Sequence, residues 1–155
     1  MKIAKKTVIA PNRMLIPDIA RLVHEGKSVS MTVKGISMLP FIKNKDIVVL
    51  EKAGNIRKFD VVLASVGKQE YVLHRVVDVK GDRYKLMGDG NLKECEVCTA
   101  ADILAVACKV MKNGKAVDLR SDRSIGKAAL WNVLLPVRRW LLAVYKLGYK
   151  IYEKN

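Results

Sequence analysis

The sequence predicts a mainly β protein with one hydrophobic core, and three observations carry this prediction. The chain has 155 residues, which is enough for a single domain. Half of the residues are hydrophobic but only 6% are aromatic, which favours an aliphatic core rich in β-branched side chains. From residue 28 to 119, short apolar or alternating segments recur about every 8 to 12 residues with turns between them, as in antiparallel β proteins.

A short helix is predicted before the strands, over residues 16–25. Pro17 suits its first turn, Gly26 provides a stop signal, and apolar residues at 19, 22 and 23 share one face. His24 lies in the last turn, where a solvent-facing role is favoured over a catalytic one. We expect residues 1–14, which precede this helix, to form a flexible basic lead-in.

The β domain is predicted to span residues 15–120. Alternation and apolar runs predict strands over residues 28–33, 46–50, 59–64, 71–79, 84–87, 103–111 and 116–119. Turn signals separate them, among them Gly67-Lys68, Gly81-Asp82 and Asn113-Gly114. The polar run 93–99 is interpreted as part of a connection.

Residues 121–155 are expected to form a basic amphipathic helical segment, with the helix over residues 124–152 broken or kinked at Pro136. Six apolar residues fall on one face at helical spacing: Val137, Trp140, Leu141, Val144, Leu147 and Ile151. Such a helix can lie in the headgroup region of an anionic membrane. It can equally cover an open face of the β domain while its Lys and Arg residues are solvated, and the sequence leaves both interpretations open.

The charge balance calls for an anionic partner. Twenty-nine Lys and Arg residues face 15 Asp and Glu residues, a formal net charge of +14, although a basic chain can also simply stay soluble. Nucleic acid is not expected, because neither an aromatic platform nor a recognition helix is visible. No apolar run resembles a signal peptide or approaches the ~20 residues of a membrane span, so we expect a cytoplasmic or peripheral membrane location.

The three cysteines, Cys95, Cys98 and Cys108, are interpreted as ordinary reduced thiols. Their number is odd, and a single Cys-x-x-Cys without a second pair is a poor metal site. We therefore expect no metal and no cofactor.

Ser37 is the candidate nucleophile, because it lies in a turn between the flexible Gly35 and Pro40. A serine hydroxyl needs a base, and His74 stands in an apolar strand that favours the neutral imidazole. The alternative for His74 is a core histidine bound to a backbone carbonyl. Asp89, after the next strand, could orient His74, although a Gly-Asp-Gly-Asn run is by itself more often a turn.

Taken together, these motifs resemble the signal peptidase I superfamily, and most closely its histidine-type branch, found in archaea and the endoplasmic reticulum. The resemblance covers about residues 29–91 and rests on Gly35-x-Ser37-Met38-x-Pro40, Asp46, Asp60-Val61-Val62, His74-Arg75-Val76-Val77 and Gly88-Asp89-x-Asn91. The related SOS-repressor autoproteases share the serine motif but use lysine as the base. The resemblance implies coiled antiparallel β-sheets of the signal-peptidase and LexA type.

The resemblance further implies a serine endopeptidase that removes a signal or leader segment from a precursor peptide. Ser37 would attack the scissile carbonyl, His74 would act as base and then as acid, and Asp89 would orient His74. The backbone N–H of Ser37 would bind the oxyanion with Gly35 allowing close approach, and Met38 and Pro40 would shape a pocket for small residues. The substrate would bind as an added strand.

The chain departs from the family pattern at several positions. Lys45 and Phe59 stand where the family usually has glycine before an aspartate, which leaves the geometry of those turns open. Histidine-type members have a second aspartate shortly after the Gly-Asp-x-Asn run, where this chain has Cys95 between Glu94 and Glu96, and the sequence leaves open whether either glutamate participates. The N-terminal anchor of signal peptidases is not seen, so a specialised leader peptide is an equal candidate substrate. The alternative function is an inactive member that binds membranes or nucleic acid.

Overall fold

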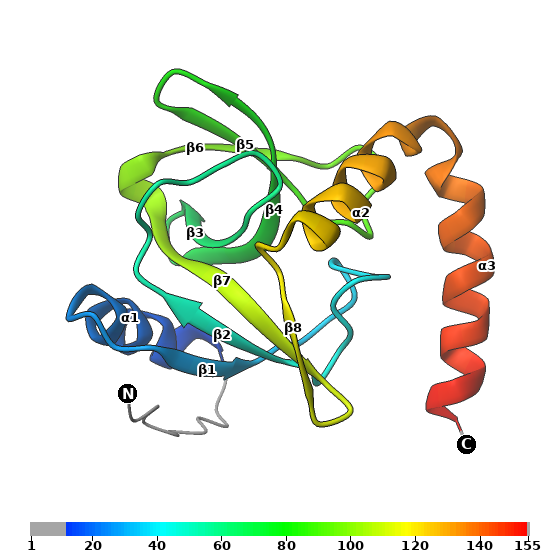
Figure 1. The fold of residues 1–155 in the computed structure, drawn as a ribbon, viewed down its shortest axis with the longest axis horizontal. Coiled ribbons are helices and arrows are strands. Elements are labelled where there is room, and N and C mark those ends of the chain that lie inside the picture. The colour runs from blue at the N-terminus through cyan, green and yellow to red at the C-terminus, as the bar shows by residue number, and fades with distance from the viewer. Residues whose placement is uncertain (1–11, 155) are drawn as a thin grey trace.

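The computed structural model describes residues 12–154 and confirms the mainly β fold (Figure 1). One antiparallel sheet has the strand order β1-β2-β7-β3-β4-β5-β6, and β8 pairs with β7 outside that order. The strands are β1 Val29–Thr32, β2 Ile47–Glu51, β3 Val61–Gly67, β4 Glu70–Lys80, β5 Arg83–Met87, β6 Glu96–Thr99, β7 Ile103–Lys112 and β8 Lys115–Asp118. The helices are α1 Asn12–His24, η1 Ala100–Asp102 (3₁₀), α2 Asp122–Val133 and α3 Leu135–Glu153.

Strand β3 explains why its sequence is continuously apolar. Val61 and Leu63 belong to one core cluster, and Val62 and Ala64 belong to another. Since successive side chains of a strand point to opposite faces, both faces of β3 are buried. The first cluster also receives α1, which packs beside β1 and β7, and it receives Met38 and Ile42 from the connection between β1 and β2. The segment that carries Ser37 is therefore fixed by apolar anchors in the core.

The first helix differs from its prediction. Helix α1 begins at Asn12, so Pro17 lies inside the helix and not in its first turn, and this part of the prediction was wrong. Ile16, Ile19 and Val23 are buried against the sheet, and this packing stabilises a helix that contains an unfavourable proline. Of the predicted lead-in, residues 1–11 lie outside the described residues, and residues 12–14 form the first turn of α1.

Strand β6 was missed in the polar run. It pairs with β5, with Leu86 opposite Glu96 and Tyr84 opposite Cys98. Only Cys98 of its four residues is buried, so the strand has too few apolar residues to be recognised from its own sequence. Pairing with β5 provides the backbone hydrogen bonds that stabilise it.

The C-terminal segment is helical as predicted, and its break lies just before Pro136. Helix α2 ends at Val133, and α3 starts with the proline in its first turn, where a missing N–H costs nothing. Within residues 12–154 no helix is long and apolar enough to cross a membrane.

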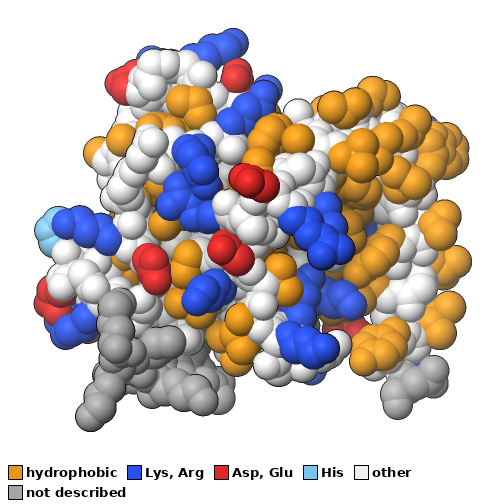
Figure 2. Space-filling model, viewed as in Figure 1, with side chains coloured by type: hydrophobic (Ala, Val, Ile, Leu, Met, Phe, Trp, Pro, Cys, Tyr) orange, Lys and Arg blue, Asp and Glu red, His pale blue; other side chains and the backbone are white. Residues whose placement is uncertain are grey.

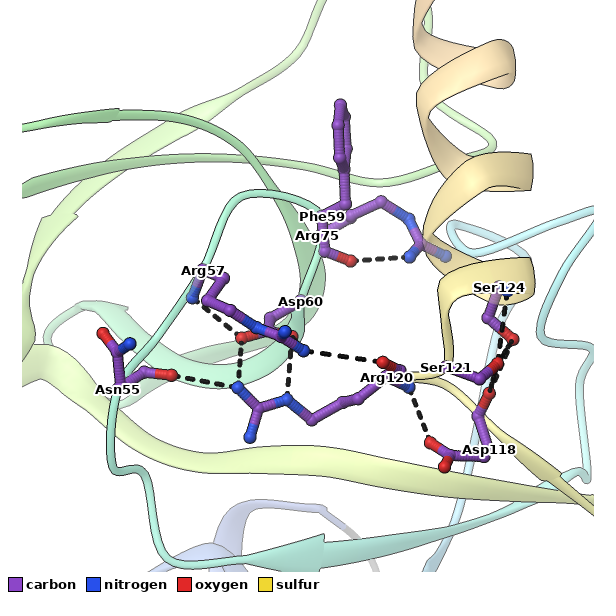
Figure 3. Close-up of polar contacts among 9 residues, drawn as sticks. All are labelled: Asn55, Arg57, Phe59, Asp60, Arg75, Asp118, Arg120, Ser121 and Ser124. Atoms are coloured by element: carbon purple, nitrogen blue, oxygen red, sulfur yellow. Dashed lines mark hydrogen bonds and ion pairs between the residues drawn. The ribbon is translucent and has the colours of Figure 1, made fainter.

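A buried ion pair ties the start of α2 to the β domain (Figure 3). Asp60 is fully buried before β3, and the Arg120 guanidinium contacts both of its carboxylate oxygens at 3.0 Å. The backbone N–H of Arg57 donates to Asp60 at 2.8 Å, and Arg120 also donates to the carbonyl of Asn55 at 2.9 Å. Arg120 thereby sets where the chain leaves the sheet and enters the C-terminal helices.

Lys45 and Phe59, which stand where the family usually has glycine, both adopt a left-handed backbone conformation. Lys45 has a φ of 72° and Phe59 a φ of 75°. The Lys45 N–H donates to the carbonyl of Val33 at 2.8 Å, and the Phe59 N–H donates to that of Val76 at 2.6 Å. These hydrogen bonds hold both residues in a conformation that costs an L-amino acid about 1–2 kcal/mol.

Candidate active site

Ser37 lies in a tight connection between β1 and β2, here called the serine loop (residues 35–42). Gly35 opens it with a φ of 95°, and its N–H donates to Asn44 Oδ1 at 3.0 Å. After the serine, the Ile42 N–H donates to the Met38 carbonyl at 2.9 Å, which closes a helix-like turn. Met38 is buried, so the residue next to Ser37 cannot move without disturbing the core. The backbone at Ser37 is therefore well positioned, as a catalytic serine requires.

A second connection packs against the serine loop. This aspartate loop (residues 88–91) follows β5, and its Gly90 N–H donates to the Ser37 carbonyl at 2.7 Å. A Cβ atom added to Gly88 would come within 2.5 Å of the Ser37 carbonyl oxygen, and one added to Gly90 within 2.6 Å of the Ile36 carbonyl oxygen. Only glycine fits at either position, which explains why the Gly-Asp-Gly-Asn run accompanies the serine motif in the sequence.

His74 lies on β4 and is 6% exposed. Its Nδ1 atom is 2.9 Å from Oε2 of Glu96 on β6. If Nδ1 carries the proton and donates it to this carboxylate, Nε2 is left as an acceptor, which is the form a general base needs. The His74 side chain is almost fully shielded from solvent, whereas the Glu96 side chain is only partly buried.

Asp89 pairs with Arg75 and not with His74. Its two carboxylate oxygens accept from Nε and Nη2 of Arg75 at 2.8 and 2.7 Å, and both side chains are almost fully buried. Strands β4 and β5 do pair, as the prediction for Asp89 required. However, neighbouring residues of a strand point to opposite faces, so a partner of Arg75 lies away from His74. Nη1 of Arg75 also donates to the Phe59 carbonyl at 2.8 Å (Figure 3).

Ser37 and His74 line one cavity of about 150 Å³. In residues 12–154 no hydrogen bond links the two side chains, and such contacts are often loose without substrate. The side chains that shape the cavity are largely apolar and include Met31, Val33, Met38, Leu63 and Leu73. Of the other predicted site residues, Gly35 and Met38 line the cavity, whereas Pro40 is half-buried outside its lining.

A larger cavity of about 470 Å³ adjoins the first and is lined by Glu96. The two cavities share Ile16, Tyr71 and Val72 in their linings. Taken together, the two linings follow β4 from Glu70 to His74 and include Ser37 and Glu96, and they are here called the groove. An extended peptide is the kind of ligand that a groove along a strand can accept.

The described residues hold no group of three or more His, Cys, Asp or Glu side chains that could bind a metal ion. The cysteines are free thiols, and burial raises the pKa of Cys108 to about 11. Cys98 is buried on β6, and its pKa is also raised, chiefly by burial.

Sequence reasoning left open whether Glu94 or Glu96 takes part in the site, and it missed Arg75 as the partner of Asp89. For Glu96, the available signal was its place after the Gly-Asp-x-Asn run, near the second aspartate of histidine-type members of the family. For Arg75, the signal was a charged residue in the middle of an apolar strand, which needs a buried counter-charge.

Comparisons with known proteins identify the family of this chain. A search among curated proteins finds no match to this chain. The family described as Peptidase S24-like matches residues 4–119, roughly three quarters of the chain and all eight strands. The matched region contains Ser37, His74 and Glu96 but neither α2 nor α3. The chain therefore belongs to the Peptidase S24-like family, which points to a serine peptidase or autopeptidase.

Proposed function

We propose that this protein is a serine endopeptidase of the histidine type that removes a signal or leader segment from a precursor peptide. In this proposal Ser37 is the nucleophile, His74 the general base and Glu96 the acid that orients His74. The observation that carries it is the 2.9 Å contact between His74 Nδ1 and Glu96, on a histidine that shares a cavity with Ser37.

The proposed reaction follows from these positions. Nε2 of His74 takes the Ser37 proton as Oγ attacks the scissile carbonyl carbon, and the backbone N–H of Ser37 stabilises the oxyanion. His74 then gives the proton to the leaving amine, which releases one product and leaves an acyl-serine. A water molecule, deprotonated by His74, hydrolyses the ester and regenerates Ser37. Glu96 holds Nδ1–H throughout and stabilises the imidazolium.

The substrate class is supported by the shape of the groove. A volume of about 150 Å³ beside Ser37 suits a small side chain before the cut. The larger cavity beside Tyr71 and Glu96 leaves room for further residues of an extended chain. A leader with small residues before its cleavage point would satisfy both parts of the groove.

Asp89 has a different role in this proposal. Because it neutralises Arg75 in the interior and carries the aspartate loop, it positions the Ser37 backbone without touching the substrate. Replacing one member of such a buried ion pair leaves an unpaired charge and costs about 3–5 kcal/mol of stability. Its loss would therefore act through folding.

A cleavage assay with four variants tests the proposal. The substrate is a fluorescence-quenched peptide with an apolar stretch and alanine before the scissile bond. Ser37→Ala and His74→Ala should abolish cleavage, and Glu96→Gln should lower kcat by about 10³- to 10⁴-fold with an unchanged urea midpoint. Asp89→Asn should instead lower the urea midpoint.

The paired outcomes separate the two acids. If Asp89→Asn stays fully stable but loses kcat as a triad variant would, while Glu96→Gln cleaves normally, Asp89 is the orienting acid and our assignment is wrong. If Ser37→Ala and His74→Ala both cleave at the wild-type rate, the chain is not a serine peptidase of this mechanism. Glu94→Gln, two residues before Glu96, serves as the matched control.

A further inference from the structure

Helix α3 presents its apolar face to solvent. The six residues at helical spacing, Val137, Trp140, Leu141, Val144, Leu147 and Ile151, are all exposed and are here called the outer stripe. Trp140 is 65% exposed and Val144 is 76% exposed. Figure 2 shows apolar side chains gathered on the side of the molecule formed by α2 and α3. An exposed apolar patch of this extent marks a surface that binds something.

The face of α3 turned towards the protein combines the buried Leu142 with basic residues that bind backbone carbonyls. Arg138 is only 2% exposed, and its Nη2 donates to the Trp131 carbonyl at 2.9 Å. Nη1 lies 3.4 Å from the Asn91 carbonyl, and Lys146 Nζ lies 3.4 Å from the Gly90 carbonyl. Burial lowers the pKa of Arg138, which is the cost of holding a guanidinium there. The helix is thus attached by Arg138 and Lys146 together with the buried Leu142, while the six residues of the outer stripe are left exposed.

The charge around the outer stripe identifies the partner. Between residues 124 and 152 the chain has five Lys and Arg residues and no acidic residue. Arg139 and Lys150 are exposed near the stripe, and Arg139 stacks on the Trp140 ring at 5.0 Å. A second copy of the same surface would bring like charges together. Anionic lipid headgroups complement the charge, while the acyl region accepts Trp, Leu and Val side chains.

We propose that α3, with the end of α2, lies in the headgroup region of an anionic bilayer and docks the β domain on the membrane surface. Helix α3 has 19 residues and is about 28 Å long, and the exposed Leu130 and Val133 of α2 extend the apolar surface. This inference does not depend on the peptidase proposal, because it rests on a segment outside the family match.

The attachment of α3 places the active site beside the membrane. Arg138 and Lys146 contact the aspartate loop, and the Gly90 N–H of that loop donates to the Ser37 carbonyl. Trp131 of α2 donates to the Asp89 carbonyl at 2.8 Å and packs edge-on against Phe41 of the serine loop. Docking through these helices would hold the catalytic groove near a substrate that is itself at the bilayer.

Cosedimentation of the 155-residue protein with vesicles tests the proposal. The anionic vesicles contain phosphatidylcholine with about 30% phosphatidylglycerol, and the neutral vesicles contain phosphatidylcholine alone. We expect binding to the anionic vesicles that weakens with salt, and a blue shift of tryptophan fluorescence that Trp140→Phe removes. Val144→Glu should weaken the binding at least about tenfold, because it places a carboxylate in the acyl boundary. Val117→Glu makes the same change at an exposed position of β8 and should bind as the wild type does.

The basic residues are tested separately. The double variant Arg139→Gln, Lys150→Gln should bind anionic vesicles about thirtyfold more weakly, from the contribution of each basic residue near a charged surface. Lys80→Gln, Lys115→Gln removes the same charge from exposed strand positions and should have little effect. If the wild type does not bind anionic vesicles, or binds neutral ones equally well, the proposal fails. If the protein is dimeric without vesicles and Val144→Glu makes it monomeric, the outer stripe binds a second copy of the chain and not a membrane.

Discussion

Replacing Gly88 by alanine should damage catalysis far more than the small size of the change suggests. The added Cβ would stand 2.5 Å from the Ser37 carbonyl oxygen and 2.9 Å from Nδ2 of Asn91. The Asn91 side chain can rotate away, but the backbone carbonyl of the nucleophile cannot. Real Cβ atoms essentially never approach closer than 3.0 Å, so the two loops must separate by at least half an ångström.

That separation acts on both stability and rate. Forcing an extra methyl into a packed site costs about 1–3 kcal/mol, and a misplacement of the nucleophile of nearly 1 Å costs about 10²-fold in rate. We expect kcat to fall by about 10- to 100-fold at a temperature where Gly88→Ala is still folded. KM should change little, because the groove along β4 is not touched.

Steady-state cleavage of the fluorescence-quenched peptide, with urea denaturation of the same samples, measures this effect. Gly54→Ala is the matched control, since its added Cβ meets no atom within 4 Å and its φ is not positive. If Gly88→Ala retains the kcat of Gly54→Ala, the packing of the aspartate loop on the serine loop does not position Ser37. The same result would undermine the structural explanation of the Gly-Asp-Gly-Asn run.

Two further predictions concern stability. Arg120→Met leaves the fully buried Asp60 with the Arg57 backbone N–H and, as a counter-charge, the Arg57 guanidinium 3.9 Å away, and should lower the free energy of unfolding by about 3 kcal/mol in urea denaturation. Arg123→Met, at an exposed position of α2, is its control, and equal midpoints would contradict the proposed role of the ion pair. Lys45→Gly should raise the free energy of unfolding by about 0.5–1 kcal/mol, because it relieves a positive φ at an exposed residue. Lys68→Gly, where φ is not positive, should not stabilise, and a destabilised Lys45→Gly would show that the lysine side chain matters more than its backbone.

Much of the fold could be predicted because local patterns agree with the tertiary structure. The apolar run of β3 is buried on both faces, and the Asn113-Gly114 turn, with both residues at positive φ, joins β7 to β8. Pro136 lies in the first turn of α3, where its missing N–H is tolerated. Where a local signal was weak or misleading, as in β6 or at Pro17, packing against a neighbour decided the outcome.

The candidate site was predictable in part. Ser37 and His74 do line one cavity, but the acid next to His74 depends on which strand lies beyond β5. The sequence order of Asp89 and His74 says nothing about the face on which each side chain lies. Arg75 is the neighbour of His74 in the chain, but their side chains point to opposite faces of β4, and Asp89 lies on the face of Arg75 and pairs with it.

The turns at Lys45 and Phe59 also show that residue type alone does not determine backbone conformation. The family's glycine is absent, yet both backbones are left-handed, because hydrogen bonds to Val33 and Val76 hold them there. The preference of a non-glycine residue against the left-handed conformation, about 1–2 kcal/mol, is outweighed by the contacts of the surrounding sheet.

The sequence by itself determined the mainly β class, the serine and histidine motifs, the break before Pro136 and an amphipathic stripe on the last helix. Only the tertiary structure decided that Glu96 contacts His74, that Asp89 is paired with Arg75, and that the stripe faces outward while Arg138 is buried. The physical reason is the same in each case. Periodicity along a chain tells which residues share a face, but the neighbour that this face meets is set by segments distant in sequence, through strand pairing and packing.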